Sequence, residues 1–162
     1  MPANDNGNAG DGDVDPAGLA SLVNAMFEDR IPVIHRLGIR IVEVRDGFIA
    51  GAAPLEGNLN HQGSMYAGTL FGLGEALGAV VFAANFDLSR FTATVKDVQI
   101  RYRRPAMTDV RAEASLDAST VARIKREADT VGKAEFVLDA ELKDTAGVVV
   151  ATTHGTYQVR RL

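Results

Sequence analysis

Along the chain, the apolar positions switch between helical spacing and strand-like alternation three times. The apolar residues that recur at helical spacing near its start are Leu19, Leu22, Val23, Met26 and Phe27. Asp15 and Pro16 supply an N-cap and a first-turn proline, so this spacing predicts a helix that ends near Arg30. Residues 38–44 and 47–55 have strand-like patterns separated by turn residues, and together they predict a hairpin.

The longest apolar stretch, residues 65–84, contains a single charged residue, Glu75. Its length would suit a membrane span, but Glu75 lies at its centre and no basic cluster flanks it. We therefore interpret it as the buried helix of a soluble protein, which other elements must surround. From there to the C-terminus the pattern alternates and predicts four more strands, at 91–104, 110–116, 133–143 and 148–159. Residues 120–129 are charged, and their pattern leaves open a short helix or a loop.

These elements predict an α+β fold in which an antiparallel sheet is wrapped around one long central helix, with a short N-terminal helix. With 162 residues, the chain is long enough for one domain with a substantial core, which we place at 16–162. Residues 1–15 are mostly Asn, Asp and Gly, and they predict a disordered acidic tail. This tail has neither the basic start nor the apolar run of a secretory signal, and we predict a cytoplasmic protein.

Composition removes several kinds of chemistry. The formal net charge of −4 argues against a general nucleic-acid surface or an anionic-membrane surface. Without cysteine the chain has no disulfide, thiolate nucleophile or thiolate metal site. Its histidines, His35, His61 and His154, show no i, i+4 pairing, so we expect no metal site and no redox cofactor.

The apolar stretch and the loop before it carry the most informative motif. Asn60 is followed six positions later by Tyr66, Ala67 and Gly68, and Glu75 lies nine positions after Tyr66. The motif resembles that of hot-dog acyl-CoA thioesterases of the phenylacetate-degradation type, in which Asn, His-Gly-Gly and Asp have the same offsets. It is more similar to the thioesterase domain called YiiD C-terminal. The resemblance includes the segments IPVIHRLGIRIVEV and YRRPA on either side of the helix.

The resemblance implies a hot-dog fold and thioester hydrolysis, with Glu75, Asn60, Ala67 and Gly68 as catalytic residues. Hydrolysis needs a carboxylate that activates water or attacks directly, and donors that polarise the carbonyl. An apolar setting should raise the pKa of Glu75 toward a value useful for a base. The free amides of Ala67 and Gly68 at the helix start can polarise the carbonyl. Asn60 can order the attacking water or bond the thioester oxygen.

Further residues are candidates for substrate contact: His61, Tyr66, Thr92, Thr94, Lys96, Arg101, Arg103 and Arg104. Enzymes of the resembled type often place a Ser or Thr on the strand after the helix. Thr92 or Thr94 is the candidate for that role, and Val95 and Lys96 are the alternatives for the same position. The arginines can meet the phosphates of coenzyme A. The implied substrate is an acyl-CoA or an acyl carrier protein carrying the same thioester.

Helix geometry predicts a shared site. Glu75 lies nine positions after Tyr66, roughly 13 Å along a helix axis and about half a turn around it. One chain cannot bring both to one small carbonyl. Two antiparallel helices related by a two-fold axis can place Glu75 of one chain beside Asn60 and Ala67 of the other. We therefore predict a homodimer or homotetramer with active sites at the dimer interface.

Other interpretations stay open at this point. Glu75 could be a structural carboxylate paired with a strand Arg or Lys, and Asn60 could cap the helix or hold a turn. His61 and Glu75 have the spacing of the catalytic pair in hot-dog dehydratases, although residues 62–64 lack the aromatic and Pro that follow the His there. A non-catalytic acyl-binding module would use the same fold.

Overall fold

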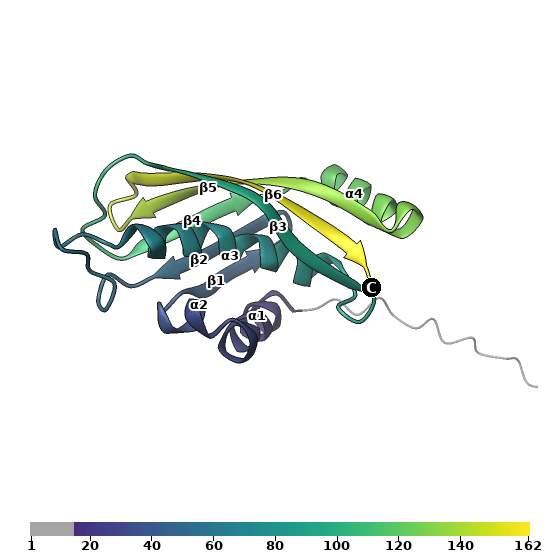
Figure 1. Ribbon diagram of the computed structural model, residues 1–162, viewed down its shortest axis with the longest axis horizontal. Coiled ribbons are helices and arrows are strands. Elements are labelled where there is room, and N and C mark those ends of the chain that lie inside the picture. Colours follow the sequence, from purple (N-terminus) through teal and green to yellow (C-terminus); the bar gives the residue numbers. More distant parts are fainter. Residues whose placement is uncertain (1–14) are drawn as a thin grey trace, which may run out of the picture.

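The computed structural model describes residues 15–162, so the predicted acidic tail lies outside the described residues except for Asp15. A six-stranded antiparallel sheet curves around one long helix, as predicted, and shorter helices pack against it (Figure 1). The helices are α1 (Pro16–Arg30), α2 (Pro32–Arg36), α3 (Ala67–Asn85) and α4 (Ala118–Val131). The strands are β1 (Arg40–Arg45), β2 (Phe48–Ala53), β3 (Phe91–Tyr102), β4 (Val110–Ser115), β5 (Lys133–Asp144) and β6 (Val149–Arg161).

The strands follow the order β1-β2-β4-β5-β6-β3, and every neighbouring pair is antiparallel. β1 and β3 are therefore the edge strands. Alternate side chains of β5 are buried in the core while those between them are largely exposed, which confirms the alternation predicted for this strand. The buried ones are Ala134, Phe136, Leu138, Ala140 and Leu142.

α1 packs against β1, and three of the five residues whose spacing predicted the helix are buried, whereas Leu22 is exposed. Its buried side chains are Leu19, Val23 and Phe27. The Asn24 carboxamide satisfies the backbone of Ile41 on β1, because its Nδ2 donates to the carbonyl at 2.9 Å and its Oδ1 accepts from the amide at 2.8 Å. A side chain thus pairs with an edge strand where no further strand is present.

α3 is the core helix, and glycines let β6 approach it closely. A Cβ at Gly74 would lie 2.5 Å from Cγ2 of Thr153, and one at Gly78 would lie 2.0 Å from Cε1 of Tyr157. Any larger residue would displace these side chains. By length and composition alone α3 could cross a membrane, but 56% of its most apolar window is buried, and the core helix of a soluble protein meets the same criterion.

The charged segment left open by its pattern lies within the helix α4. The Asp117 carboxylate caps it by accepting from the Thr120 amide at 2.8 Å, and Gly132 ends it in the left-handed region with φ of 82°. The structure also contains α2, which the sequence pattern did not predict. Its five residues are too few to show a period.

Candidate active site

Glu75 lies in the middle of α3 and is half-buried. Phe71 and Phe82 lie on the same helix face, and both remain accessible. Burial is the cause that raises the pKa of the Glu75 carboxyl. No side chain among the described residues forms an ion pair or hydrogen bond with this carboxylate. The alternative in which Glu75 is a structural carboxylate would need an Arg or Lys partner, and the described chain supplies none.

The first turn of α3 presents free backbone donors. Tyr66 is the N-cap residue; its amide donates to the Asn58 carbonyl at 2.7 Å, and its carbonyl accepts from the Thr69 amide at 3.0 Å. Within the described chain, the amides of Ala67 and Gly68 have no acceptor. At the positive end of the helix dipole, these two amides can bind a developing oxyanion.

Asn58 holds the preceding loop against α3, a role that the sequence analysis missed. Its side chain is only 6% exposed. Nδ2 donates to the carbonyls of Leu37 at 2.8 Å and Pro54 at 2.9 Å, and Oδ1 accepts from the Thr69 hydroxyl at 3.0 Å. Nothing in the spacing of Asn58 distinguishes it from a solvent-exposed loop asparagine, because two of its partners, Leu37 and Thr69, are 21 and 11 positions away in the sequence.

Asn60 organises the turn that leads into α3. Its Oδ1 accepts from the amides of Gln62 at 2.8 Å and Ser64 at 3.2 Å, and its Nδ2 donates to the Ser64 hydroxyl at 2.9 Å. The alternative in which Asn60 holds a turn is confirmed, and a role in chemistry stays a prediction that uses its second Nδ2 hydrogen. His61 is exposed on the same turn, and its ring bonds no side chain or backbone group of the described chain.

Two tyrosine rings flank the free amides. The Tyr66 ring occupies the space beside Gly68, where a Cβ would lie 2.3 Å from the ring Cε1. Tyr102, at the end of β3, donates from its hydroxyl to the Ala67 carbonyl at 3.0 Å. Burial and the neighbouring Tyr66 raise the pKa of Tyr102. Both rings stay accessible, so a ligand at the amides can reach them.

Thr92, Thr94 and Lys96 lie on the face of the sheet away from α3, called the outer face below. In the β3–β6 register the two threonines pair with outward residues of β6, whereas Tyr157 points toward α3. Cross-strand partners share a face. Lys96 lies at a register shift and contacts Glu135 at 2.5 Å. Within one chain, these three residues are therefore not brought to Glu75.

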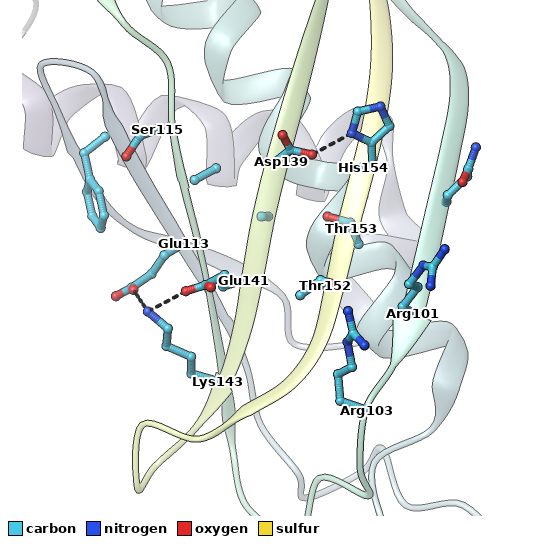
Figure 2. Close-up of a pocket in the computed structure, with 14 residues that line it drawn as sticks. Arg101, Arg103, Glu113, Ser115, Asp139, Glu141, Lys143, Thr152, Thr153 and His154 are labelled. Atoms are coloured by element: carbon cyan, nitrogen blue, oxygen red, sulfur yellow. Dashed lines mark hydrogen bonds and ion pairs between the residues drawn. The ribbon is translucent and has the colours of Figure 1, made fainter.

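Arg101 and Arg103 also project from the outer face, into a hollow of about 630 Å³ (Figure 2). In the described chain, no acidic side chain lies within ion-pair distance of either. Arg104 follows the end of β3 and is exposed. The sheet therefore separates Arg101 and Arg103 from Glu75 within one chain.

The same hollow contains Ser115, Asp139 and His154, in an order that does not suit nucleophilic catalysis (Figure 2). Asp139 on β5 lies between Ser115 on β4 and His154 on β6, and its Oδ1 is 2.6 Å from Nδ1 of the histidine. A relay requires the histidine between the other two. Among residues 15–162, no group of three or more His, Asp or Glu side chains could hold a metal ion.

Glu75 and the Ala67 amide do not reach one small carbonyl within a chain. They are eight residues apart on α3, which corresponds to about 12 Å along the axis. A site that uses both groups therefore needs a second chain.

A sheet wrapped around a helix with a mid-helix carboxylate and free N-terminal amides defines the class of hot-dog thioesterases. Within this class, the chain belongs to the family described as "Putative thioesterase (yiiD_Cterm)", whose model matches residues 20–161. The match confirms the resemblance seen in the motif around Asn60 and Glu75. Among curated proteins, no sequence matches the chain.

Solved structures agree with this family and fold. A Pseudomonas aeruginosa protein of unknown function, described as a probable thioesterase, is 41% identical, with a TM-score of 0.80 over 88% of this chain and 95% of that one. A putative thioesterase from Shewanella oneidensis is 23% identical, with a TM-score of 0.76 over 88% and 97%. A Haemophilus influenzae thioesterase is 16% identical, with a TM-score of 0.70 over 88% and 91%. The last two likenesses concern the fold alone, and the predicted hot-dog fold is confirmed.

Proposed function

We propose that the protein is an acyl-CoA thioesterase that hydrolyses a thioester to a carboxylic acid and a free thiol. Membership of a thioesterase family supports the reaction class. One observation carries the mechanism: Glu75 is a half-buried carboxylate with a raised pKa and no counter-ion in the described chain. Such a group is costly to the fold unless it is used.

In the proposed reaction, the Glu75 carboxylate takes a proton from water, and the water oxygen attacks the thioester carbonyl carbon. The amides of Ala67 and Gly68 from the partner subunit bind the oxyanion of the tetrahedral intermediate. The C–S bond then breaks, and the leaving thiolate receives the proton held by Glu75. Tyr66 lies beside these amides, and in this mechanism Tyr66 and Asn60 contact the acyl thioester, whose thiol belongs to coenzyme A or an acyl carrier protein.

The proposed sites require at least a homodimer. β3 is a twelve-residue edge strand, and Val95 and Tyr102 on it leave apolar surface exposed, as does Phe71 on α3. Two copies of one edge strand related by a two-fold axis pair antiparallel, so their α3 helices also run antiparallel. This arrangement supports the pairing of Glu75 from one subunit with the Ala67 amide of the other. The cytoplasmic location stays a prediction from the sequence.

Thiol release from short-chain, long-chain and aromatic acyl-CoAs tests the reaction and the substrate class together. We expect hydrolysis by the wild type, and a decrease of at least about a hundredfold in Glu75→Gln, which keeps the side-chain shape but removes the base. Glu28→Gln, an exposed change on α1, is the matched control and should keep the wild-type rate. A folded Glu75→Gln variant with wild-type turnover would overturn the proposal.

His61 separates this proposal from the dehydratase alternative. In the proposed thioesterase, His61→Ala keeps most of the activity. Asn60→Ala loses much of it, because the turn loses the hydrogen bonds that the Asn60 side chain makes and the thioester loses the contact proposed for that side chain. Hydration of crotonyl-CoA is measured in parallel. Hydratase turnover that disappears in His61→Ala but not in Asn60→Ala would replace the thioesterase assignment.

A further inference from the structure

Two tyrosine hydroxyl groups tie α3 to the sheet at the two residues that the proposed reaction uses. Tyr102 on β3 donates to the Ala67 carbonyl at 3.0 Å, and Tyr157 on β6 donates to the Glu75 carbonyl at 3.1 Å. These carbonyls are about 12 Å apart along the helix axis. Two bonds at that separation restrain both the rotation of the helix and its translation along the sheet.

Neither bond is needed to satisfy the helix backbone. In an α-helix the carbonyl of residue i already accepts from the amide of residue i+4. Removal of either tyrosine hydroxyl therefore leaves no unpaired carbonyl, and its cost in stability is small. The two hydroxyl groups instead fix the orientation of α3 on the sheet, because each holds one point of the helix against a particular strand.

Glycines at two positions leave space for the Tyr157 ring, where any larger residue would collide with it. A Cβ at Gly78 would lie 2.0 Å from its ring, and one at Gly155 would lie 2.9 Å from its hydroxyl oxygen. Phe136 stacks on the ring with a centroid separation of 5.3 Å. Burial and the charge of Glu75 raise the pKa of Tyr157, so its hydroxyl keeps its proton and remains a donor. The ring is therefore held in a single position behind Glu75.

Tyr102 restrains the opposite end of the site. Its bond to Ala67 holds the first helical turn, and the amides of Ala67 and Gly68 belong to that turn. The raised pKa of Tyr102 keeps this hydroxyl protonated as well. The Asn58 carbonyl supports the same turn through the Tyr66 amide, from the loop side. The turn is thus fixed from both the loop and the sheet.

We propose that Tyr102 and Tyr157 are positioning residues of the active site. Tyr102 aligns the oxyanion-binding amides, and Tyr157 aligns Glu75; neither touches the reacting atoms. The proposal rests on the proposed thioesterase function. Displacement of catalytic groups by about 1 Å can lower a rate by about a hundredfold, so small shifts of α3 matter for turnover before they matter for folding.

Tyr102→Phe and Tyr157→Phe test the proposal, because both keep the ring and remove the hydroxyl. We expect kcat to fall about five- to tenfold in each, with KM within about twofold and the melting temperature little changed. Asn85→Ala is the control: it removes a side-chain bond to the Val81 carbonyl of the same helix, 2.8 Å long, and should keep wild-type kcat. Unchanged kcat in both tyrosine variants, or an equal loss in Asn85→Ala, would refute the proposal.

Mixed dimers separate the two roles. Each chain gives Glu75 to one site and its Ala67 amide to the other, so a heterodimer of Tyr102→Phe and Glu75→Gln chains keeps one intact site and about half the wild-type activity. A heterodimer of Tyr157→Phe and Glu75→Gln chains has no intact site and should show about a tenth or less. Equal activity in the two heterodimers would contradict the separate roles.

Hydrogen exchange distinguishes failure of this proposal from failure of the proposed function. If the wild type hydrolyses no thioester, the function fails, and the anchoring is judged on the amides of α3 alone. Faster exchange over residues 69–79 in both tyrosine variants, but not in Asn85→Ala, supports the two anchors. Wild-type exchange in the tyrosine variants shows that the hydroxyl groups do not position the helix.

Discussion

Glu75 is the residue whose charge the fold accommodates least, because burial raises its pKa and no cation in the described chain compensates. A protonated Glu75 suits the folded state, whereas the proposed reaction needs the carboxylate. The same residue therefore links catalysis and stability through a single titration. Its position on an accessible helix face, between Phe71 and Phe82, lets water reach it without a charged partner.

This link predicts a pH-dependent difference between wild type and Glu75→Gln. The pKa of Glu75 in the folded state lies above the ordinary value of 4.5. Below pH 4.5, Glu75 is protonated in both the folded and the unfolded state and costs no stability. As the pH rises through the raised pKa, the folded protein must bury a charge and becomes less stable. In thermal melts at fixed protein concentration, Glu75→Gln should match the wild type in acid and melt higher at neutral pH. The exposed change Glu56→Gln, which removes a carboxylate that has no ion-pair partner among the described residues, should show no such trend. A lower melting temperature for Glu75→Gln at neutral pH would mean that the carboxylate is stabilised by a partner.

At the scale of elements, the contact between α3 and β6 leaves no room for a methyl group. Gly78→Ala places a Cβ 2.0 Å from the Tyr157 ring. Phe136 stacks on that ring and limits its movement. Overpacking of this kind destabilises by about 1–3 kcal/mol. Gly18→Ala is the matched change in α1, where the new Cβ would be 3.8 Å from its nearest neighbour. There the helix propensity of alanine should stabilise by up to about 1 kcal/mol. Opposite signs in urea unfolding would support this packing; equal signs would contradict it.

At the scale of the whole molecule, the two edges of the sheet differ. α1 covers β1 and pairs with it through Asn24, whereas β3 keeps a free edge in the described chain. An uncovered edge of twelve residues with exposed apolar side chains favours association with another copy. The proposed shared active site and this asymmetry of the sheet therefore point to the same interface.

Two exposed valines of the sheet provide a test of that interface. Val95 on β3 is 43% exposed, and Val137 on the interior strand β5 is 45% exposed. Val95→Asp places a charge at the proposed interface, so sedimentation should show monomers and thiol release should be lost with them. Val137→Asp should keep both the dimer and the activity. Dissociation of the dimer by Val137→Asp but not by Val95→Asp would show that the interface lies on the outer face of the sheet instead of at the β3 edge.

The elements followed from the sequence because periodicity is a local property of the chain. The strand predicted at 110–116 is β4, the one at 133–143 is β5, and both agree to within a residue at each end. The offsets among Asn60, Tyr66 and Glu75 were likewise enough to indicate the family, because its motif lies within one loop and one helix. The short helix α2 was missed because it is too brief to repeat.

Tertiary structure alone decided which residues meet. Their partners on β6 place Thr92 and Thr94 on the outer face, and the register shift between Val95 and Asp97 places Arg101 on that same face, which alternation along one strand cannot reveal. The bond from Tyr102 to Ala67 spans 35 positions and the bond from Tyr157 to Glu75 spans 82. Such contacts depend on strand order and on the rotation of α3, and both are set by packing of the whole core rather than by any local pattern.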